Sequence, residues 1–216
     1  MMINFIGVYG ASGFGKEVMP LVRQQFATLK KEQFVFIDDG QAGTNLNGYS
    51  VLSYHDFSSK NDSSKAVCIA IANSQVREKL TERLHQDQVQ LLSIAAQNVI
   101  VQDEVELAEG SLLCSFVCLT SNIKIGKCFH ANLYSYVAHD CIIGDYVTFA
   151  PGVKCNGNIH IEDHAYIGTG AILKQGTPDK PLVIGKGAIV GMGAVVTKDV
   201  PAGVTVVGNP ARILNK

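Results

Sequence analysis

Tryptophan is absent from this sequence of 216 residues, and charge of either sign is scarce. There are 18 basic and 19 acidic residues, which leaves a formal net charge of −1. A chain so close to neutrality offers no basic surface for nucleic acid or for an anionic membrane. Apolar runs long enough to cross a bilayer, about 20 residues, are also missing. We therefore expect no nucleic-acid partner and no membrane partner.

We expect no export signal, and the cysteines show no paired motif. The opening INFIGV lacks the basic stretch of a signal peptide and runs into a glycine-rich turn, so it is typical of a buried strand. The six cysteines form no C-x-x-C pair, and only Cys114 and Cys118 have the spacing of zinc ligands, with no second pair to complete a site. We expect a cytoplasmic protein without metal, whose thiols are reduced and mostly buried.

What the sequence does contain is a repeat, because an apolar residue returns at every sixth position after residue 100. A period of six fits neither an α-helix at 3.6 nor a strand at 2. It fits a solenoid with triangular coils, in which each unit supplies one short strand and one corner and three units complete a coil. The positions are Val101, Leu107, Leu113, Leu119, Ile125, Ala131, Val137, Ile143, Phe149, Cys155, Ile161, Ile167 and Leu173.

The repeat is interrupted once, after Leu173, and resumes at Ile184. The intervening KQGTPDKPLV contains two prolines and a glycine, so we expect a loop at 174–183 that projects from the coil. The chain continues to VPAGVTVVGNPARILNK, whose prolines predict a cap over the last coil. The all-β solenoid domain is therefore predicted over residues 98–216.

Residues 1–97 have a different pattern, that of a small α/β domain. Strands are predicted at 3–9, 34–40 and 66–74, and helices at 18–29 and 75–87. Strands that alternate with helices predict a parallel sheet in a Rossmann-like unit. A complete NAD-binding domain is not expected, because the second mononucleotide-binding half is missing.

The glycine-rich turn after the first strand and the acidic pair after the second are candidates for binding a nucleotide diphosphate. Gly10, Gly13 and Gly15 give G-x-x-G-x-G, which differs from the dinucleotide fingerprint. Backbone N–H groups at a helix N-terminus can still hold a pyrophosphate. Asp38 and Asp39 can accept hydrogen bonds from a ribose or a base. The alternative is a plain strand–helix turn with a solvated acidic corner.

The two halves together resemble a known enzyme family. The segments YGASGFG, FIDD and AIANSQVREKL, followed by a solenoid that carries AHDCIIGDYVTFAPGVKCNGNI, are similar to the bacterial nucleotide-sugar N-acetyltransferases from Gly7 to Leu214. The resemblance implies a left-handed parallel β-helix and a homotrimer, with acetyl-CoA bound along the β-helix between adjacent subunits. It also implies acetylation of the 4-amino group of a nucleotide-linked 4-amino-4,6-dideoxyhexose, for surface polysaccharide or glycan synthesis.

The resemblance also assigns a role to the unit VAHDCI. The family's catalytic histidine precedes an acidic residue at this point, which implies His139 as general base and Asp140 as the carboxylate that tunes it. An imidazole suits the removal of a proton from an attacking amine. Neighbours on a strand point to opposite faces, so the two side chains can cooperate only at a coil corner.

The other expected site residues fall into two groups. Thr148 stands where some family members have a second histidine, and the backbone N–H of Gly157 is the alternative oxyanion donor. Phe14 stands where relatives often have a histidine, which leaves acceptor specificity open. The nucleotide sugar is expected at Ser12, Gly13, Phe14, Asp38, Asp39, Asn73 and Asn132, and acetyl-CoA at Thr148, Gly157, Thr169 and Met192.

Two other functions remain open at this point. One is a sugar O-acetyltransferase of the sialic acid type, because a related group with the same plan acetylates hydroxyls. The other is a non-catalytic protein that binds a nucleotide sugar and uses the solenoid only for assembly. The sequence does not distinguish UDP, dTDP and GDP, and it does not reveal the stereochemistry of the sugar.

Overall fold

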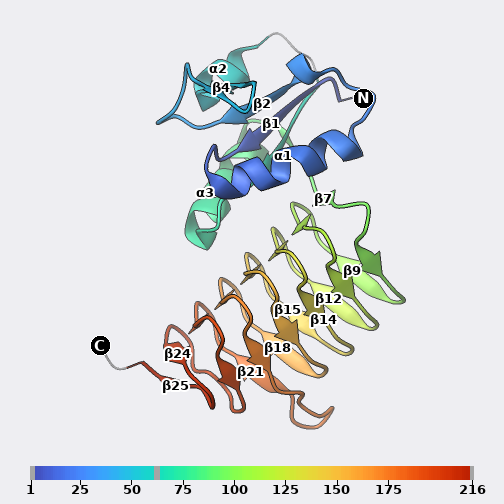
Figure 1. Ribbon diagram of the computed structural model, residues 1–216, viewed down its shortest axis with the longest axis vertical. Coiled ribbons are helices and arrows are strands. Elements are labelled where there is room, and N and C mark those ends of the chain that lie inside the picture. The colour runs from blue at the N-terminus through green and yellow to red at the C-terminus, as the bar shows by residue number, and fades with distance from the viewer. Residues whose placement is uncertain (1–2, 61–63, 215–216) are drawn as a thin grey trace. The chain divides into compact units, whose positions relative to one another are not determined.

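The computed structural model describes residues 3–60 and 64–214, which form two compact units, Met1–Ile94 and Ala95–Lys216. Figure 1 shows an α/β unit in blue to green and a stack of coils in green to red. The two-part fold class predicted above, a small α/β domain and a parallel β-helix, is confirmed. The boundary lies after residue 94, against an expected boundary after residue 97.

The first unit contains one sheet with strand order β3-β4-β2-β1-β5-β6, in which only β3 and β4 pair antiparallel. Its core consists of apolar residues from β1, β2 and β5 and from the helices. The strands are β1 (Phe5–Tyr9), β2 (Phe34–Ile37), β3 (Asn45–Leu46), β4 (Tyr49–Leu52), β5 (Lys65–Ile69) and β6 (Gln90–Leu91), and the helices are α1 (Gly13–Gln25), α2 (Tyr54–Ser59), α3 (Ser74–Gln86) and a 3-10 turn (Lys31–Gln33).

Helix α1 begins five residues earlier than predicted, at Gly13 rather than at residue 18. Gly13 and Gly15 therefore belong to the first turn of the helix, whereas Gly10 precedes it. Gly15 is required there, because a Cβ atom would collide with the carbonyl oxygen of Gly10. The hairpin β3–β4, helix α2 and strand β6 were not predicted, since each is too short to show a periodic pattern.

The second unit is a parallel β-helix with three sheets along its faces (Figure 1). Sheet 1 contains β7 (Ile94–Ala95), β10 (Leu112–Leu113), β13 (His130–Ala131), β16 (Thr148–Phe149), β19 (Tyr166–Ile167), β22 (Ile189–Val190), β24 (Thr205–Val207) and β25 (Arg212–Ile213). Sheet 2 contains β8 (Ile100–Val101), β11 (Cys118–Leu119), β14 (Tyr136–Val137), β17 (Lys154–Cys155), β20 (Ile172–Leu173) and β23 (Val195–Val196). Sheet 3 contains β9 (Val105–Leu107), β12 (Ile123–Ile125), β15 (Ile142–Ile143), β18 (Ile159–Ile161) and β21 (Leu182–Ile184).

The predicted inward positions form the core of this β-helix. From Leu113 to Leu173, every sixth residue is at most 4% exposed. The first two positions depart from the prediction, because Val101 is 51% and Leu107 is 38% exposed. Both belong to the first coil of the repeat, which has a following coil to pack against and no preceding one.

The corners are formed by residues in the left-handed region of φ. We name each corner by the sheets that it joins, so that corner 1–2 lies between sheets 1 and 2. At corner 2–3 each of four successive coils contributes one such residue, with φ between 56° and 58°. These residues are Glu104, Asn122, Asp140 and Asn158. Asparagine and aspartate tolerate this conformation better than most residues, which explains their recurrence here.

The predicted projecting loop leaves corner 2–3 between β20 and β21 and spans residues 174–181. It ends two residues earlier than expected, because Leu182 and Val183 already pair with Ile159 and His160. Val200 and Val206 are buried at the far end of the core, and β24 pairs antiparallel with β25. Among the helices that the structure describes, none has the length and apolarity needed to span a membrane.

Candidate active site

His139 and Asp140 lie together at corner 2–3, between β14 and β15. The imidazole Nδ1 is 2.7 Å from Asp140 Oδ2. Side chains of adjacent residues in a strand point to opposite faces. Asp140 has φ of 58°, which breaks this alternation and lets its side chain contact that of His139. The structure thus places the pair at a corner, as their cooperation requires.

The Asp140 carboxylate is held ionised. Its pKa is lowered by the hydrogen bond from His139 and then by a second one from Asn122 Nδ2, which is 3.2 Å from Asp140 Oδ1. An ionised acceptor at Nδ1 favours the tautomer with the proton on that nitrogen. Nε2 then carries the lone pair. It has no hydrogen-bond partner among the described residues, and the His139 side chain is 48% exposed.

Gly157, on the next coil, lies against the imidazole of His139. A Cβ atom at position 157 would be 2.5 Å from both Cε1 and Nε2 of the ring. Its carbonyl accepts a hydrogen bond from Gly176 N at 3.0 Å, whereas its own N–H has no acceptor within the described part of the chain. A buried N–H without a partner is a candidate donor to a ligand beside His139 Nε2.

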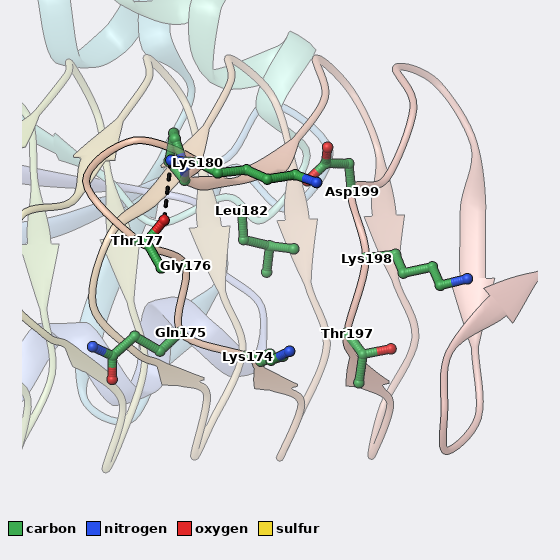
Figure 2. Close-up of a pocket in the computed structure, with 10 residues that line it drawn as sticks. Lys174, Gln175, Gly176, Thr177, Lys180, Leu182, Thr197, Lys198 and Asp199 are labelled. Atoms are coloured by element: carbon green, nitrogen blue, oxygen red, sulfur yellow. Dashed lines mark hydrogen bonds between the residues drawn. The ribbon is translucent and has the colours of Figure 1, made fainter.

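A groove of about 560 Å³ opens further along the same corner, between the projecting loop and the segment after β23. Figure 2 shows Lys174, Lys180 and Lys198 around it. None of these three lysines forms an ion pair with a described residue. Asp199 also lines the groove, so three lysines stand against one carboxylate, and this excess of positive charge suits phosphate groups. Gly176 connects the wall of the groove to Gly157 through a hydrogen bond.

Six of the seven residues expected to bind the nucleotide sugar, all except Asn132, gather at the carboxyl ends of parallel strands β1, β2 and β5. Ser12 is the N-cap of α1, but its hydroxyl makes no capping bond, and both Ser12 and Gly13 are exposed. Phe14 follows in the first turn and is half-buried. Asp38 Oδ2 accepts a hydrogen bond from Ala11 N at 3.3 Å, which joins the acidic pair to the glycine segment.

Two residues of this group already have structural partners. Asp39 Oδ1 accepts a hydrogen bond from Tyr54 N at 2.7 Å, at the start of α2. Asn73 is the N-cap of α3, and its Oδ1 accepts bonds from the backbone N–H groups of Gln75 and Val76. These bonds use only Oδ1 of each side chain. Asp39 Oδ2 and the amide nitrogen of Asn73 take no part in them.

The remaining expected residues do not join His139 within one chain. Asn132, Thr169 and Met192 lie at corner 1–2, on the other edge of sheet 2 from corner 2–3. Asn132 Oδ1 bonds to Leu133 N at 3.0 Å, and Met192 is 81% exposed. Thr148 lies on sheet 1 and is buried. Within a single chain, the expected residues of corner 1–2 and sheet 1 are therefore separate from the dyad at corner 2–3.

Sequence reasoning missed two residues of neighbouring coils, one bonded to the dyad itself and one bonded to the residues that flank it. Asn122 contacts Asp140 from the preceding coil, and Asn156 bonds to Tyr136 and Cys141 from the following one. For Asn122 the signal was present, because it lies 18 residues before Asp140, which is the coil spacing of the paired strands. No signal in the sequence alone distinguished Asn156.

Comparison with known proteins gives consistent matches over nearly the whole chain. Residues 6–84 match the PglD N-terminal domain family. The chain is 48% identical over 219 residues to a GDP-perosamine N-acetyltransferase of Escherichia coli O157:H7, covering 99% of this chain and 98% of that protein.

Two solved structures are similar in fold and in sequence. WeeI from Acinetobacter baumannii AYE has a TM-score of 0.97 and 79% identity, covering 97% of this chain and 99% of that chain. The acetyltransferase domain of PglB from Neisseria gonorrhoeae FA1090, in complex with acetyl coenzyme A, has a TM-score of 0.88 and 28% identity, covering 99% of this chain and 100% of that one.

Proposed function

Because the chain belongs to the hexapeptide-repeat nucleotide-sugar N-acetyltransferases, we propose that it transfers acetyl from acetyl-CoA to the 4-amino group of a nucleotide-linked 4-amino-4,6-dideoxyhexose. GDP-perosamine is the first acceptor to test, since the relative named for it is 48% identical over almost the full length. The observation that carries the proposal is the half-exposed imidazole of His139, whose Nδ1 is bonded to Asp140 at 2.7 Å.

This geometry supports a direct acyl transfer. The sugar amine attacks the thioester carbonyl, and Nε2 of His139 takes the proton that the nitrogen loses. Asp140 stabilises the imidazolium that forms, because its carboxylate is already ionised and bonded to Nδ1. Collapse of the tetrahedral intermediate breaks the carbon–sulfur bond, and the CoA thiolate leaves and is protonated. The N–H of Gly157 is our candidate donor to the oxyanion, because Thr148, the other expected donor, is buried on sheet 1 and apart from His139 of the same chain.

We assign acetyl-CoA to corner 2–3. Lys174, Lys180 and Lys198 offer three positive charges for its phosphates in the groove of Figure 2. From there the pantetheine arm can follow the corner toward Gly157 and His139, since Gly176 in the loop is bonded directly to Gly157. Thr169 and Met192 lie at corner 1–2, so they contribute to the same cofactor only if a second subunit presents them.

The first prediction is therefore a homotrimer. Closed threefold symmetry can place corner 1–2 of one subunit, with Asn132, beside corner 2–3 of the next. An exposed aromatic pair at corner 1–2, Phe116 and Tyr134 stacked at 4.8 Å, is the kind of surface that interfaces bury. Light scattering at micromolar protein should give about three times the chain mass of 23.2 kDa. A monomer at that concentration contradicts an intersubunit site.

The second prediction concerns the acceptor. If Asp39 bonds to the nucleotide through Oδ2, Asp39→Ala should weaken nucleotide-sugar binding by about ten- to a hundredfold and leave acetyl-CoA binding unchanged. Calorimetric titration with each substrate measures both. The substitution also removes the 2.7 Å bond to α2, so thermal unfolding of the variant must be recorded in parallel.

Asp56→Ala is the matched control for Asp39→Ala. It also removes a carboxylate from the start of α2, where Asp56 bonds to Ser53, but it lies outside the carboxyl ends of β1, β2 and β5. It should lower the melting temperature and leave the affinity for the nucleotide sugar unchanged. Equal affinities for wild type and Asp39→Ala would support the plain strand–helix turn.

An assay of thiol release from acetyl-CoA tests the function as a whole. GDP-, UDP- and dTDP-linked 4-amino-4,6-dideoxyhexoses should each be offered, together with matched sugars that carry a hydroxyl at the same carbon. Acetylation of the amino sugars, and not of the matched sugars with a hydroxyl, supports the proposal. Acetylation of a hydroxyl identifies an O-acetyltransferase, and binding of the nucleotide sugar without thiol release identifies a non-catalytic protein.

We also propose that the reaction takes place in the cytoplasm. Acetyl-CoA and nucleotide sugars are made in that compartment. All six cysteines are free and five are buried, which suits a reducing environment.

A further inference from the structure

The coil that carries His139 departs from the repeat at residues that meet one another. The inward position after the corner is isoleucine in the coils on either side, Ile123 and Ile159, but Cys141 in this one. The outward position before the corner is Tyr136, whereas its strand partners on the neighbouring coils are a cysteine and a lysine. The repeat requires neither residue, so a local cause is needed.

Tyr136 and Cys141 are both bonded to Asn156 on the following coil. The Tyr136 hydroxyl donates to Asn156 Oδ1 at 2.8 Å, and the Cys141 thiol donates to the Asn156 carbonyl at 3.2 Å. Tyr136 precedes His139, and Cys141 follows Asp140. One residue therefore holds both ends of the segment that carries the dyad.

Asn156 is itself fixed to a third coil, because its Nδ2 donates to the carbonyl of Leu173 at 2.7 Å. Burial, and then the nearby Cys155 thiol, raise the pKa of Tyr136, so its hydroxyl remains a donor throughout the neutral range. These bonds are additional to the backbone pairing that all coils share, in which Ala138 N bonds to Cys155 O at 2.8 Å.

Asn156 also determines where Gly157 lies. Gly157 is the next residue, and its Cα packs against the imidazole edge that carries Cε1 and Nε2. A shift of Asn156 would move Gly157 relative to this edge and open space into which the ring can rotate away from Asp140. Misplacement of a reacting group by about 1 Å can cost up to a hundredfold in rate.

We propose that Asn156, held by Tyr136 and Cys141, is a positioning residue that keeps the imidazole of His139 oriented for proton transfer. This inference rests on the proposed function. Asn156 acts through His139 and Gly157, so its loss should lower kcat and not the affinity for either substrate. Its effect should be smaller when His139 is absent, because only the oxyanion contact of Gly157 is then left to disturb.

The test is a double-mutant cycle with acetyl-CoA and the acceptor that wild type uses. Tyr136→Phe removes one hydroxyl and keeps the ring, and it should lower kcat about five- to tenfold with unchanged KM values. Asn156→Ala removes both side-chain bonds and should lower kcat by about ten- to a hundredfold. In a His139→Ala background, Tyr136→Phe and Asn156→Ala should each lower kcat by a clearly smaller factor than in the wild-type background. Tyr49→Phe, in the first unit, is the control for loss of a phenol hydroxyl and should retain wild-type kcat.

The outcomes distinguish failure of the positioning role from failure of the proposed function. Equal losses with and without His139, or losses confined to KM, overturn the positioning role while acetyl transfer stands. Unchanged kcat in His139→Ala overturns it too, since there would be no base to orient. Absence of acetyl transfer in wild type removes the proposed function and the inference with it. If Asn156→Ala does not fold, Tyr136→Phe decides alone, because its ring packing is preserved.

Discussion

Replacing His139 with alanine should lower kcat by about 10²–10⁴-fold, the usual cost of losing a general base. KM for both substrates and the oligomeric state should be unchanged, because the side chain is 48% exposed and contributes little to the core. Steady-state kinetics at saturating acetyl-CoA and acceptor measure the effect. Retention of more than about a tenth of wild-type kcat would falsify the base assignment, and the amine would then have to enter already deprotonated.

Asp140→Asn is the companion variant. It keeps a side chain at the left-handed position but removes the charge that is bonded to Nδ1. The loss in kcat should be smaller than for His139→Ala. The pH–rate profile should also shift, because the substitution removes the ionised carboxylate that is bonded to Nδ1. An unchanged profile would mean that Asp140 does not tune His139.

Replacing Gly157 with alanine should lower kcat by roughly a hundredfold, although no catalytic group is removed. The added Cβ would be 2.5 Å from Cε1 and Nε2 of His139, a distance that cannot be tolerated. The half-exposed imidazole can rotate more easily than the backbone can move, so the ring should leave Asp140 while the coil stays folded. Gly157 does not have a positive φ, so alanine causes no backbone strain there.

Two comparisons isolate the cause of that loss. Added to His139→Ala, the Gly157→Ala substitution should cause little further change, since there is no ring to displace. Gly126→Ala makes contacts of another kind, with the carboxylate and backbone of Asp145 and the backbone of Gly144. Its cost should therefore appear as a lower melting temperature. If Gly157→Ala lowers the melting temperature as much as Gly126→Ala, steric displacement of His139 is not the explanation.

The β-helix was predictable from the sequence because its repeat obeys a single spacing. From Leu113 to Leu173 each predicted inward residue is buried, and the interruption after Leu173 marks the projecting loop. The first unit was less predictable. Helix α2 has six residues and strand β3 has two, and elements so short are stabilised by neighbours that a linear pattern does not reveal.

The same distinction applies to the site. His139 and Asp140 are adjacent in sequence, so their side chains can bond to each other wherever the backbone turns a corner. The repeat predicted a corner at this position. The contacts from Asn122 and Asn156 depend on how successive coils stack, and a spacing alone does not show which side chains turn toward each other. In the first unit, Asn73 follows a strand as a ligand residue would, yet its Oδ1 caps α3.

The projecting loop has a consequence for how this enzyme can diversify. Strand pairing across it spans 23 residues, from Ile159 to Leu182, whereas Ile142 pairs with His160 at a separation of 18. The five additional residues leave the register of the next coil intact, and closing a somewhat longer loop costs little free energy. Insertions or exchanges there that keep Gly176 and its bond to Gly157 can alter the groove that we assign to the acyl donor without displacing the dyad. Donor range and proton-transfer chemistry are therefore free to evolve independently.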